Sequence, residues 1–405
     1  MKILYHHRTQ ARDGCIVHIG ELIAALRALG HEVVVVAPPG TEGGPAADTG
    51  SGGPVDRLRR ALPKAAFELL EFLYAFHAFA RLYRAFRRHR PDVLYERYNL
   101  YTPTGAWLKR LTGLPVLLEV NAPLAHERAA HGGLALTPLA RWTERLAWRS
   151  ADRVLPVTSV LADHVRAAGV PDGRIAVIPN GVDPRRFAAD AAHTAAAKAR
   201  LGLEGRLVLG FTGFVREWHR LEQVVDVLAE PGPGACPHLL LVGDGPARAG
   251  IEERARQRGV ADRVTVTGVL PHDAIPGHVA AFDIALQPAV TAYASPLKLF
   301  EYMQAGRAIV APDAPNIREV LRHDGNALLF DPADPAAFGH AVRRLCRDGA
   351  LRARLGAQAR ATIAERQLTW DGNARRVAAL FEERLAGTVA DAVGTGSRRA
   401  RPDGC

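Results

Sequence analysis

Short apolar runs alternate with longer amphipathic stretches along almost the whole chain. Residues 2–6 are expected to form a strand, and residues 16–29 a helix, because apolar side chains recur there at helical spacing. Such alternation predicts an α/β fold, in which crossover helices join parallel strands. Further strands are expected at 32–37, 92–95, 116–119, 154–157, 175–179, 206–211, 239–242, 264–267, 284–287, 308–311 and 327–330.

A turn at Asn180-Gly181-Val182-Asp183-Pro184 interrupts this alternation, because Asn-Gly adopts positive φ easily and proline prevents continuation. With 405 residues, the chain exceeds the roughly 250–300 residues that a single core supports. We therefore expect one domain over 1–185 and another over 186–365. The Gly- and Pro-rich segment 41–54 is expected to be a surface loop, and 387–405, which lacks periodicity, a disordered tail.

Composition excludes several classes of protein. Hydrophobic residues make up 48% and charged residues 23%, so the chain is not disordered throughout. Cys15, Cys236, Cys346 and Cys405 are far apart, which argues against a zinc knuckle or a disulfide framework and favours the reducing cytoplasm. The net charge of +10 is only weak support for an anionic partner.

The start of the chain reads as a strand and not as a secretion signal, so a cytoplasmic protein is expected. Residues 65–86 carry too many charges to span a bilayer. The basic and aromatic stretch 57–90 leaves two interpretations open. It docks on an anionic membrane surface, at the inner face of the cell membrane, or it is a long helix packed on the sheet. No nucleic-acid-binding module is recognisable, and no nucleic-acid partner is expected.

The most informative segment runs from Tyr293 to Gly306. Ser295 followed by Pro296 is typical of a helix start, with a hydroxyl cap and proline at the first helical position. The free backbone N–H groups of such a start bind anions, and Lys298 lies in the same turn. Glu301 is placed to meet a ribose whose diphosphate lies on that helix start. The alternative is a capped surface helix with an incidental lysine.

This segment, together with Gly243-Asp244-Gly245-Pro246, the 180–183 turn and Trp370, resembles the family 4 glycosyltransferases of the GT-B superfamily over residues 1–384. The resemblance implies two Rossmann-like, doubly wound domains facing a cleft, with a last helix at 366–386 returning to the first domain. It also implies a nucleotide-diphosphate sugar donor, retention of the anomeric configuration, and neither metal nor cofactor. The acceptor is expected to be a small molecule, a glycan or a lipid-linked sugar.

An independent observation agrees with a metal-free reaction. No Asp-x-Asp pair occurs, so the usual carboxylates that hold a divalent ion on a nucleotide sugar are missing. The charge of the leaving diphosphate must then be met by backbone amides and side-chain cations. Where the family commonly has an arginine and a lysine after Gly213, this chain has Phe214 and His219. We expect Arg216 and His219 to supply the cations, the alternative being that Arg216 is a solvated loop residue.

By resemblance, the donor is expected to bind in the second domain. The residues concerned are Gly14 of the first domain and, in the second domain, His219, Gly243, Asp244, Val269, Ser295, Pro296, Leu297, Lys298 and Glu301. Gly243 and Asp244 follow a strand, where α/β proteins bind ligands, although a tight turn explains both glycines of that motif without a ligand. Asp13 occupies one place of a glycine pair that the family usually has beside Gly14.

Two further positions depart from the family pattern. Tyr293 stands where a glutamate usually contacts the donor sugar, and Asn121 stands where a histidine usually lies near the reacting sugar. Asn121 hydrogen-bonds a hydroxyl but is no general base, and His126 is a possible replacement. Acceptor contacts are expected from His7, Glu96, Arg97, Asn121 and His126, and catalytic roles from Lys298, Arg216 and Asn121.

Two other functions remain open. A nucleotide-sugar 2-epimerase has the same architecture and needs no acceptor. A GT-B pseudoenzyme acting as a binding subunit would explain the replaced histidine and glutamate. A dinucleotide dehydrogenase is disfavoured, because no Gly-x-Gly-x-x-Gly follows the first strand.

Overall fold

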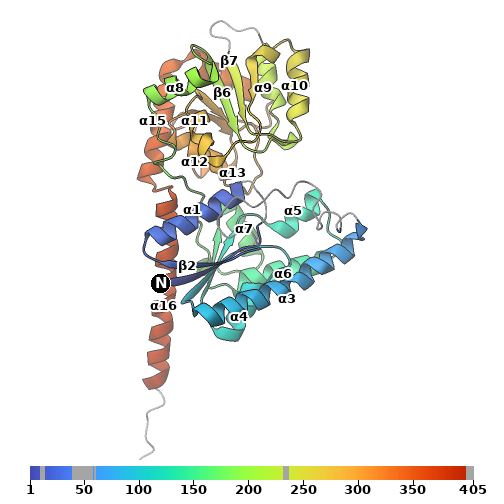
Figure 1. Ribbon diagram of the computed structural model, residues 1–405, viewed down its shortest axis with the longest axis vertical. Helices are drawn as coiled ribbons and strands as arrows, with labels where there is room; N and C mark the ends of the chain where they lie inside the picture. The colour runs from blue at the N-terminus through green and yellow to red at the C-terminus, as the bar shows by residue number, and fades with distance from the viewer. Residues whose placement is uncertain (10–13, 39–57, 59–60, 231–236, 398–405) are drawn as a thin grey trace, which may run out of the picture. The chain divides into compact units, whose positions relative to one another are not determined.

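The computed structural model describes residues 1–9, 14–38, 58, 61–230 and 237–397 (Figure 1). It divides the chain into unit 1, Met1–Ile178 with Asn373–Cys405, and unit 2, Pro179–Gly372. The division after Ile178 comes seven residues before the boundary expected at 185/186, because the turn at Asn180 already packs within unit 2. The loop expected at 41–54 and Asp13 lie outside the described residues.

Unit 1 contains a five-stranded parallel sheet in the order β2-β1-β3-β4-β5. Its strands are β1(Lys2–His6), β2(Glu32–Val36), β3(Val93–Arg97), β4(Val116–Val120) and β5(Arg153–Pro156). Strand β1 pairs with β2 on one side and β3 on the other, so the connections diverge there. At such a switch point the carboxyl ends of the strands form the usual ligand site of an α/β sheet.

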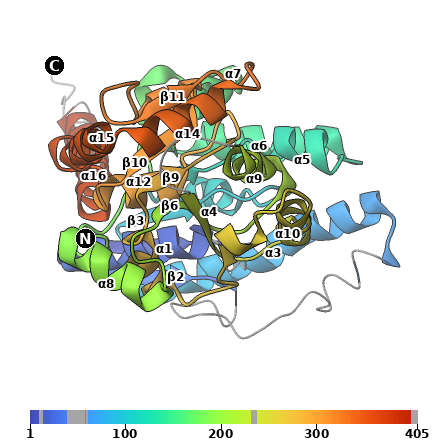
Figure 2. The same cartoon turned by 90° about the horizontal axis from the view of Figure 1, so that it is seen from above.

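Helices connect these strands (Figures 1 and 2). They are α1(Gly14–Ala28), α3(Lys64–His89), α4(Thr104–Thr112), α5(Leu124–His131), α6(Thr137–Ser150) and α7(Ser159–Ala167), with the 3-10 turn η1(Asp172–Arg174). The strand expected at 175–179 does not form. Ile175 makes one isolated bridge with Val154, and proline at 179 has no N–H group to extend the ladder.

Unit 2 contains a six-stranded parallel sheet in the order β11-β10-β9-β6-β7-β8. Its strands are β6(Leu207–Thr212), β7(Pro237–Val242), β8(Val264–Val266), β9(Ile284–Leu286), β10(Ala308–Pro312) and β11(Leu328–Phe330). Leu240 and Leu241 of β7 belong to different apolar clusters, as the alternation of a pleated strand requires. Both faces of the sheet are therefore covered, and the expected doubly wound, Rossmann-like fold is confirmed for both units.

The helices of unit 2 lie on the two faces of its sheet, and α9 and α10 lie side by side in both views (Figures 1 and 2). They are α8(Ala191–Leu201), α9(Glu222–Ala229), α10(Arg248–Gln257), α11(Ile275–Val279), α12(Leu297–Gln304), α13(Pro315–Arg318), α14(Ala337–Arg347) and α15(Gly349–Glu365). The 3-10 turns η2(Glu217–His219), η3(Ala261–Arg263) and η4(His272–Ala274) complete the unit.

The last helix, α16(Trp370–Ser397), belongs to unit 1 from Asn373 onward. Two ion pairs fasten it to the start of β5: Arg153 with Glu383 at 2.6 Å and Arg384 with Asp152 at 2.8 Å. The helix continues to Ser397, beyond the expected end at 386, because elongating a helix costs far less than starting one. Within the described residues, no helix is long and apolar enough to cross a membrane.

Candidate functional site

In unit 2 the loops that follow β6 and β7 pack backbone against backbone. Gly213 and Gly243 have φ angles of 124° and 138°. A Cβ atom on Gly243 would lie 2.1 Å from the carbonyl oxygen of Gly213, and one on Gly245 would lie 2.2 Å from that of Val215. Close packing alone therefore requires the glycines of the 243–246 motif. Asp244 accepts a hydrogen bond from Gly245 N at 2.8 Å and pairs with Arg248.

Lys298 lies in the first turn of α12 and against the end of β6. Its Nζ atom is 3.7 Å from the centroid of the Phe211 ring, a cation–π contact. A Cβ atom on Gly213 would lie 3.2 Å from the same Nζ atom, so glycine lets the ammonium approach the backbone closely without a shift. Burial lowers the pKa of Lys298 to about 7, and the charge of Glu301 acts in the opposite direction. An anion placed here would restore the charge of the lysine.

Ser295 does not cap α12, so that expectation is wrong. The residue before the helix is Pro296, and no side chain caps the first turn. Ser295 Oγ instead accepts a hydrogen bond from Asn180 N at 3.2 Å. The hydroxyl is thus used to hold the turn at the beginning of unit 2, and the first N–H groups of α12 have no capping side chain.

The loop after β6 carries Arg216 and His219, the expected substitute cations. Burial, with Lys298 and Arg216 nearby, lowers the pKa of His219 to about 3, so the expectation of a cationic His219 is wrong. Its Nδ1 accepts a hydrogen bond from Arg216 N at 3.1 Å. The neutral ring therefore carries its proton on Nε2, which can donate a hydrogen bond. Arg216 is exposed, with its guanidinium 4.9 Å from the Phe214 ring centroid.

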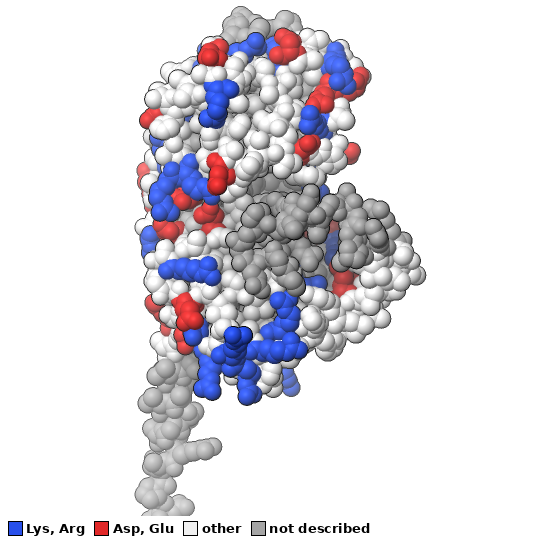
Figure 3. All heavy atoms as spheres, viewed as in Figure 1, with Lys and Arg blue, Asp and Glu red and all other residues white. Residues whose placement is uncertain are grey.

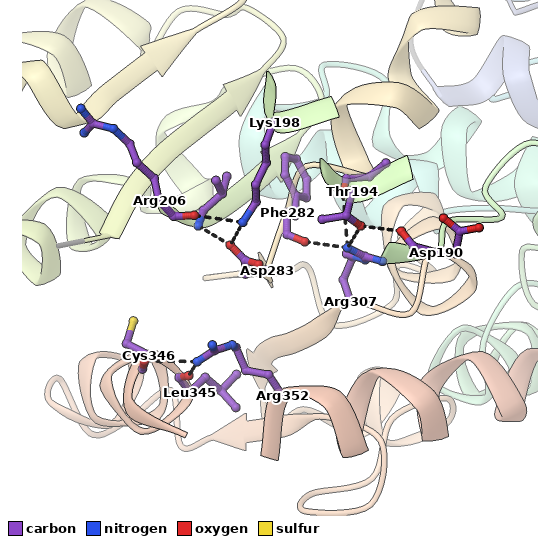
Figure 4. A network of polar contacts seen from close by, with 12 residues as sticks. Asp190, Thr194, Lys198, Arg206, Phe282, Asp283, Arg307, Leu345, Cys346 and Arg352 are labelled. Carbon is purple, nitrogen blue, oxygen red and sulfur yellow. Dashed lines mark hydrogen bonds and ion pairs between the residues drawn. The ribbon is translucent and has the colours of Figure 1, made fainter. Parts of the chain in front are cut away.

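The C-terminal half of helix α12 is held by several side-chain contacts. The hydroxyl of the buried Tyr302 accepts a hydrogen bond from Thr212 N at 2.8 Å, which ties the helix to β6. At the end of the helix, Arg307 Nε donates to Ala305 O and Arg360 Nε to Gln304 O. Figure 4 shows Arg307 pointing toward Thr194 and Phe282, close to the Lys198–Asp283 ion pair. Cations at a helix C-terminus are favourable, so these contacts stabilise α12, which carries Lys298 in its first turn.

In unit 1, a buried carboxylate at the end of β4 organises the expected acceptor residues. Glu119 accepts hydrogen bonds from the Tyr95 hydroxyl at 2.7 Å and from Asn121 Nδ2, and it pairs with Arg97 and, at 3.2 Å, with His18. Although burial opposes ionisation, these partners hold the pKa of Glu119 well below its usual range. Glu119 is not among the site residues expected from the sequence, although an acidic residue inside the apolar run 116–120 is a usable signal.

His7 and Glu96 occupy different environments at the edge of the same sheet. Burial, with His6 and Arg97 nearby, lowers the pKa of His7 to about 4, and no described residue pairs with its buried Nδ1 atom. The carboxylate of Glu96 accepts hydrogen bonds from Gly105 N and Thr104 at the start of α4, and it pairs with His6 at 2.8 Å. Glu96 is thus engaged inside unit 1, whereas His7 retains a binding capacity.

The remaining expected residues lie apart from these clusters. His126 is exposed on α5, with its ring centroid 5.5 Å from that of His164. Gly14 is the first residue of α1, and Val269, after β8, is 81% exposed. Among the described residues, no group of three or more His, Cys, Asp or Glu side chains is arranged to hold a metal ion.

Comparison with known proteins places both units in one family. Residues 13–181 match the model of a glycosyl transferase 4-like domain, and residues 195–348 match that of glycosyl transferases group 1. The 2-deoxystreptamine glucosyltransferase of Streptomyces kanamyceticus is 33% identical over 61% of this chain and 65% of its own length. The alpha-D-kanosaminyltransferase of the same organism is 26% identical over 62% and 66%. The chain thus spans slightly less than two thirds of these relatives.

Solved structures show the same fold. The Anabaena protein HepE, crystallised in complex with UDP, superposes with a TM-score of 0.71 at 18% identity, covering 96% of this chain and 100% of that one. The sucrose-phosphate synthase of Thermosynechococcus elongatus gives 0.73 at 19% identity, with coverages of 95% and 99%. Two parallel Rossmann-like sheets, and two family models that match on either side of the 180–184 turn, lead to one assignment. The chain belongs to the family 4 glycosyltransferases of the GT-B fold.

Proposed function

We propose that this protein transfers a sugar from a nucleotide-diphosphate sugar to an acceptor hydroxyl, with retention of the anomeric configuration and without a divalent ion. The single observation that supports this most is the position of Lys298. Its ammonium lies in the uncapped first turn of α12 and against Gly213. A diphosphate at this helix start would receive both the backbone N–H groups and the lysine charge.

In this proposal the bond from the anomeric carbon to the diphosphate oxygen breaks while the acceptor oxygen approaches from the same face. The acceptor proton passes to the departing phosphate oxygen, so no protein nucleophile is required. Lys298 and the Nε2–H group of His219 stabilise the negative charge that develops on the diphosphate. Glu301, one turn further along α12, binds the ribose hydroxyls, and the loop at Val269 reads the base.

The acceptor is proposed to bind unit 1, where Arg97 and Asn121 converge on Glu119 and His7 offers an uncharged ring. The names of related proteins suggest the compounds to test first. The relatives from Streptomyces kanamyceticus include a 2-deoxystreptamine glucosyltransferase, and HepE has been crystallised with UDP-glucose. A Mycobacterium tuberculosis relative, 28% identical, is a GDP-mannose-dependent phosphatidylinositol monomannoside mannosyltransferase. Small-molecule and lipid-linked acceptors are therefore both candidates.

The test is a transfer assay with UDP-glucose or GDP-mannose as donor and 2-deoxystreptamine as first acceptor, with products resolved by mass spectrometry. In Lys298→Ala, kcat should fall by about 100-fold or more and KM for the donor should rise by a smaller factor, because the lysine contacts the bound diphosphate and acts most strongly as charge develops. Glu301→Gln should instead weaken nucleotide binding. Unchanged turnover in Lys298→Ala would remove that residue from the mechanism.

Incubating the protein with donor in the absence of acceptor distinguishes the two alternative functions, an epimerase and a pseudoenzyme. Conversion of the donor to its 2-epimer would indicate an epimerase. Retained nucleotide binding without transfer or hydrolysis of any donor would indicate a pseudoenzyme that serves as a binding subunit.

We also propose that this protein is cytoplasmic and uses α3 to contact the anionic inner face of the cell membrane. Leu69, Leu73 and Phe76 are 46%, 48% and 53% exposed and lie on the same side of α3 as the exposed Arg84 and Arg87. Figure 3 shows Lys and Arg side chains gathered where Figure 1 places α3 and α4. An apolar stripe that continues into a basic one fits the interface of an anionic bilayer.

Co-sedimentation with vesicles tests this contact. The protein should bind vesicles that contain phosphatidylserine and should not bind purely phosphatidylcholine vesicles. Replacing Arg84 and Arg87 by glutamate should abolish binding, whereas the same change at the exposed Arg256 of unit 2 should not. Equal binding by all variants would refute the contact.

A further inference from the structure

The loop that leads from β9 to the start of α12 is held by buried amide side chains. This loop, residues 287–296, carries Tyr293 and Ser295 and delivers the chain to Lys298. Asn180, Gln287 and Asn316 are 7%, 1% and 3% exposed. They come from the first turn of unit 2, from the end of β9 and from α13, so three separate segments of unit 2 converge on one loop.

Each amide donates to backbone carbonyl groups of the loop. Gln287 Nε2 donates to Ala289 O at 2.5 Å, and Asn316 Nδ2 donates to Thr291 O at 3.1 Å and to Ala294 O at 2.7 Å. Asn180 Nδ2 donates to Ser295 O at 2.5 Å, while its backbone N donates to Ser295 Oγ. Because all four partners of the side-chain amides are carbonyl oxygens, the groups that face them must be NH₂ groups.

These contacts have an electrostatic consequence for the helix start. The carbonyl oxygens of Ala289, Thr291, Ala294 and Ser295 carry partial negative charge and would repel a diphosphate in the proposed site. The amides hold all four oxygens toward the interior of unit 2. The loop can then present N–H groups and Lys298 to an anion, without carbonyl groups beside them.

The amide oxygens show that stability alone does not explain these side chains. Asn180 Oδ1, Gln287 Oε1 and Asn316 Oδ1 are buried, and within the described chain none has a hydrogen-bond partner. A buried acceptor without a partner is unfavourable, and three such acceptors around one loop are unusual in a folded core. Exceptions of this kind concentrate at functional sites.

From these contacts we infer that Asn180, Gln287 and Asn316 form an amide clamp, a set of positioning residues that fixes the 287–296 loop and thereby the diphosphate-binding start of α12. None of the three touches the reacting atoms. The inference rests on the proposed function for its ligand, although the clamp itself is a property of the free protein.

The test replaces a donor amide with an isosteric carboxyl group. Asn316→Asp and Asn180→Asp each place an oxygen where an NH₂ group meets carbonyl oxygens. Asn326→Asp is the matched control, because Asn326 is 1% exposed in unit 2 and uses its Nδ2 on Val320 O and Thr362 Oγ1, away from the loop. Two variants of the clamp are used because one of them alone could fail to fold.

Two measurements are made on the full chain. Hydrogen–deuterium exchange of the free protein should show faster exchange at residues 289–299 in the clamp variants than in the wild type or in Asn326→Asp. Calorimetric titration with UDP-glucose and GDP-mannose should show binding at least tenfold weaker in the clamp variants, with affinity unchanged in the control. Two results would overturn the clamp as a positioning device. One is exchange at 289–299 in the clamp variants as slow as in the wild type. The other is faster exchange there combined with wild-type affinity for the nucleotide sugars.

The two proposals fail separately. If the wild type binds neither nucleotide sugar nor their free nucleotides UDP and GDP, the proposed function is refuted. Exchange at residues 289–299 then decides the clamp by itself, because that measurement involves no ligand.

Discussion

At the scale of single residues, the chemistry of unit 2 depends on one lysine in an unusual environment. Lys298 is half-buried against an aromatic ring and a glycine, and desolvation lowers its pKa to about 7. His219, beside it, is uncharged. At neutral pH Lys298 is therefore only partly protonated, while Arg216 on the loop of His219 keeps its charge. A bound diphosphate would favour the protonated lysine, so donor binding and proton uptake should be linked.

This linkage predicts a pH dependence of donor affinity. Below pH 7 the lysine of the free protein is already charged, and affinity for UDP-glucose should be constant. Above pH 7 binding must take up a proton, so affinity should fall by up to about tenfold per pH unit. Calorimetry between pH 6 and 9 measures this, and UDP-glucose is suitable because its diphosphate does not titrate in that range. Lys298→Arg is the control, since arginine stays charged, and a flat wild-type profile would contradict the linkage.

Glu119 makes the corresponding prediction for unit 1. Its pKa is held below the usual range in the folded protein, so its stabilising contribution is present above about pH 4.3 and is lost as pH falls further. Glu119→Gln leaves the charge of Arg97 buried without its partner and should cost about 3–5 kcal/mol at neutral pH. Urea unfolding at pH 7 and at pH 3 measures both effects. The exposed Glu253→Gln should change neither, and an equally mild effect of the two substitutions would show that Glu119 is not a buried ion-pair centre.

At the scale of elements, the loops after β6 and β7 pack against each other because two glycines, Gly243 and Gly245, allow their backbones to touch. Sequence patterns located these loops, since Gly213 and the 243–246 motif follow apolar strands. They also left open whether the glycines serve a ligand or a turn. The contacts of Gly243 with Gly213 and of Gly245 with Val215 show that packing requires them. Any role toward the donor is an additional one.

Gly243→Ala should therefore disturb both loops at once. The new Cβ atom would lie 2.1 Å from Gly213 O at a φ of 138°, so the variant should lose about 2–4 kcal/mol of stability and bind nucleotide sugars more weakly. Gly250→Ala is a matched control, because Gly250 lies inside α10 with open space around its Cα. That change should stabilise the protein by up to about 1 kcal/mol. Thermal unfolding and calorimetry distinguish the two, and a harmless Gly243→Ala would refute the packing argument.

At the scale of the whole molecule, each unit has its own sheet, and the chain passes between the units after Ile178 and again after Gly372. The proposed donor residues, apart from Gly14, lie in unit 2, whereas the residues proposed for the acceptor lie in unit 1. Binding of the donor should therefore stabilise unit 2 more than unit 1, and binding of the acceptor should do the reverse. Helix α16 completes unit 1 through its ion pairs with residues 152 and 153.

Saturating donor should stabilise unit 2 selectively. At 100 times its dissociation constant a ligand adds about 2.7 kcal/mol to the state that binds it. Hydrogen–deuterium exchange with UDP-glucose should slow for β6, β7 and α12, while β2 and β5 of unit 1 keep their rates. Gly243→Ala, which weakens the site, should reduce the effect. Equal slowing in both units would show that they unfold as a single cooperative body.

Much of this architecture is determined by short stretches of the sequence and could be predicted from them. Apolar periodicity located almost every strand within two residues, because a buried strand between turn residues is readable without its neighbours. The place of α12 and of Lys298 in its first turn was visible for the same reason, although the Ser295 cap was not formed. The amide clamp, the neutral state of His219, the ionised Glu119 and the true partner of Ser295 were not. Each depends on groups that are distant in the chain, such as Asn180 and Ser295, and burial and hydrogen bonding between such groups exist only once the sheets have formed.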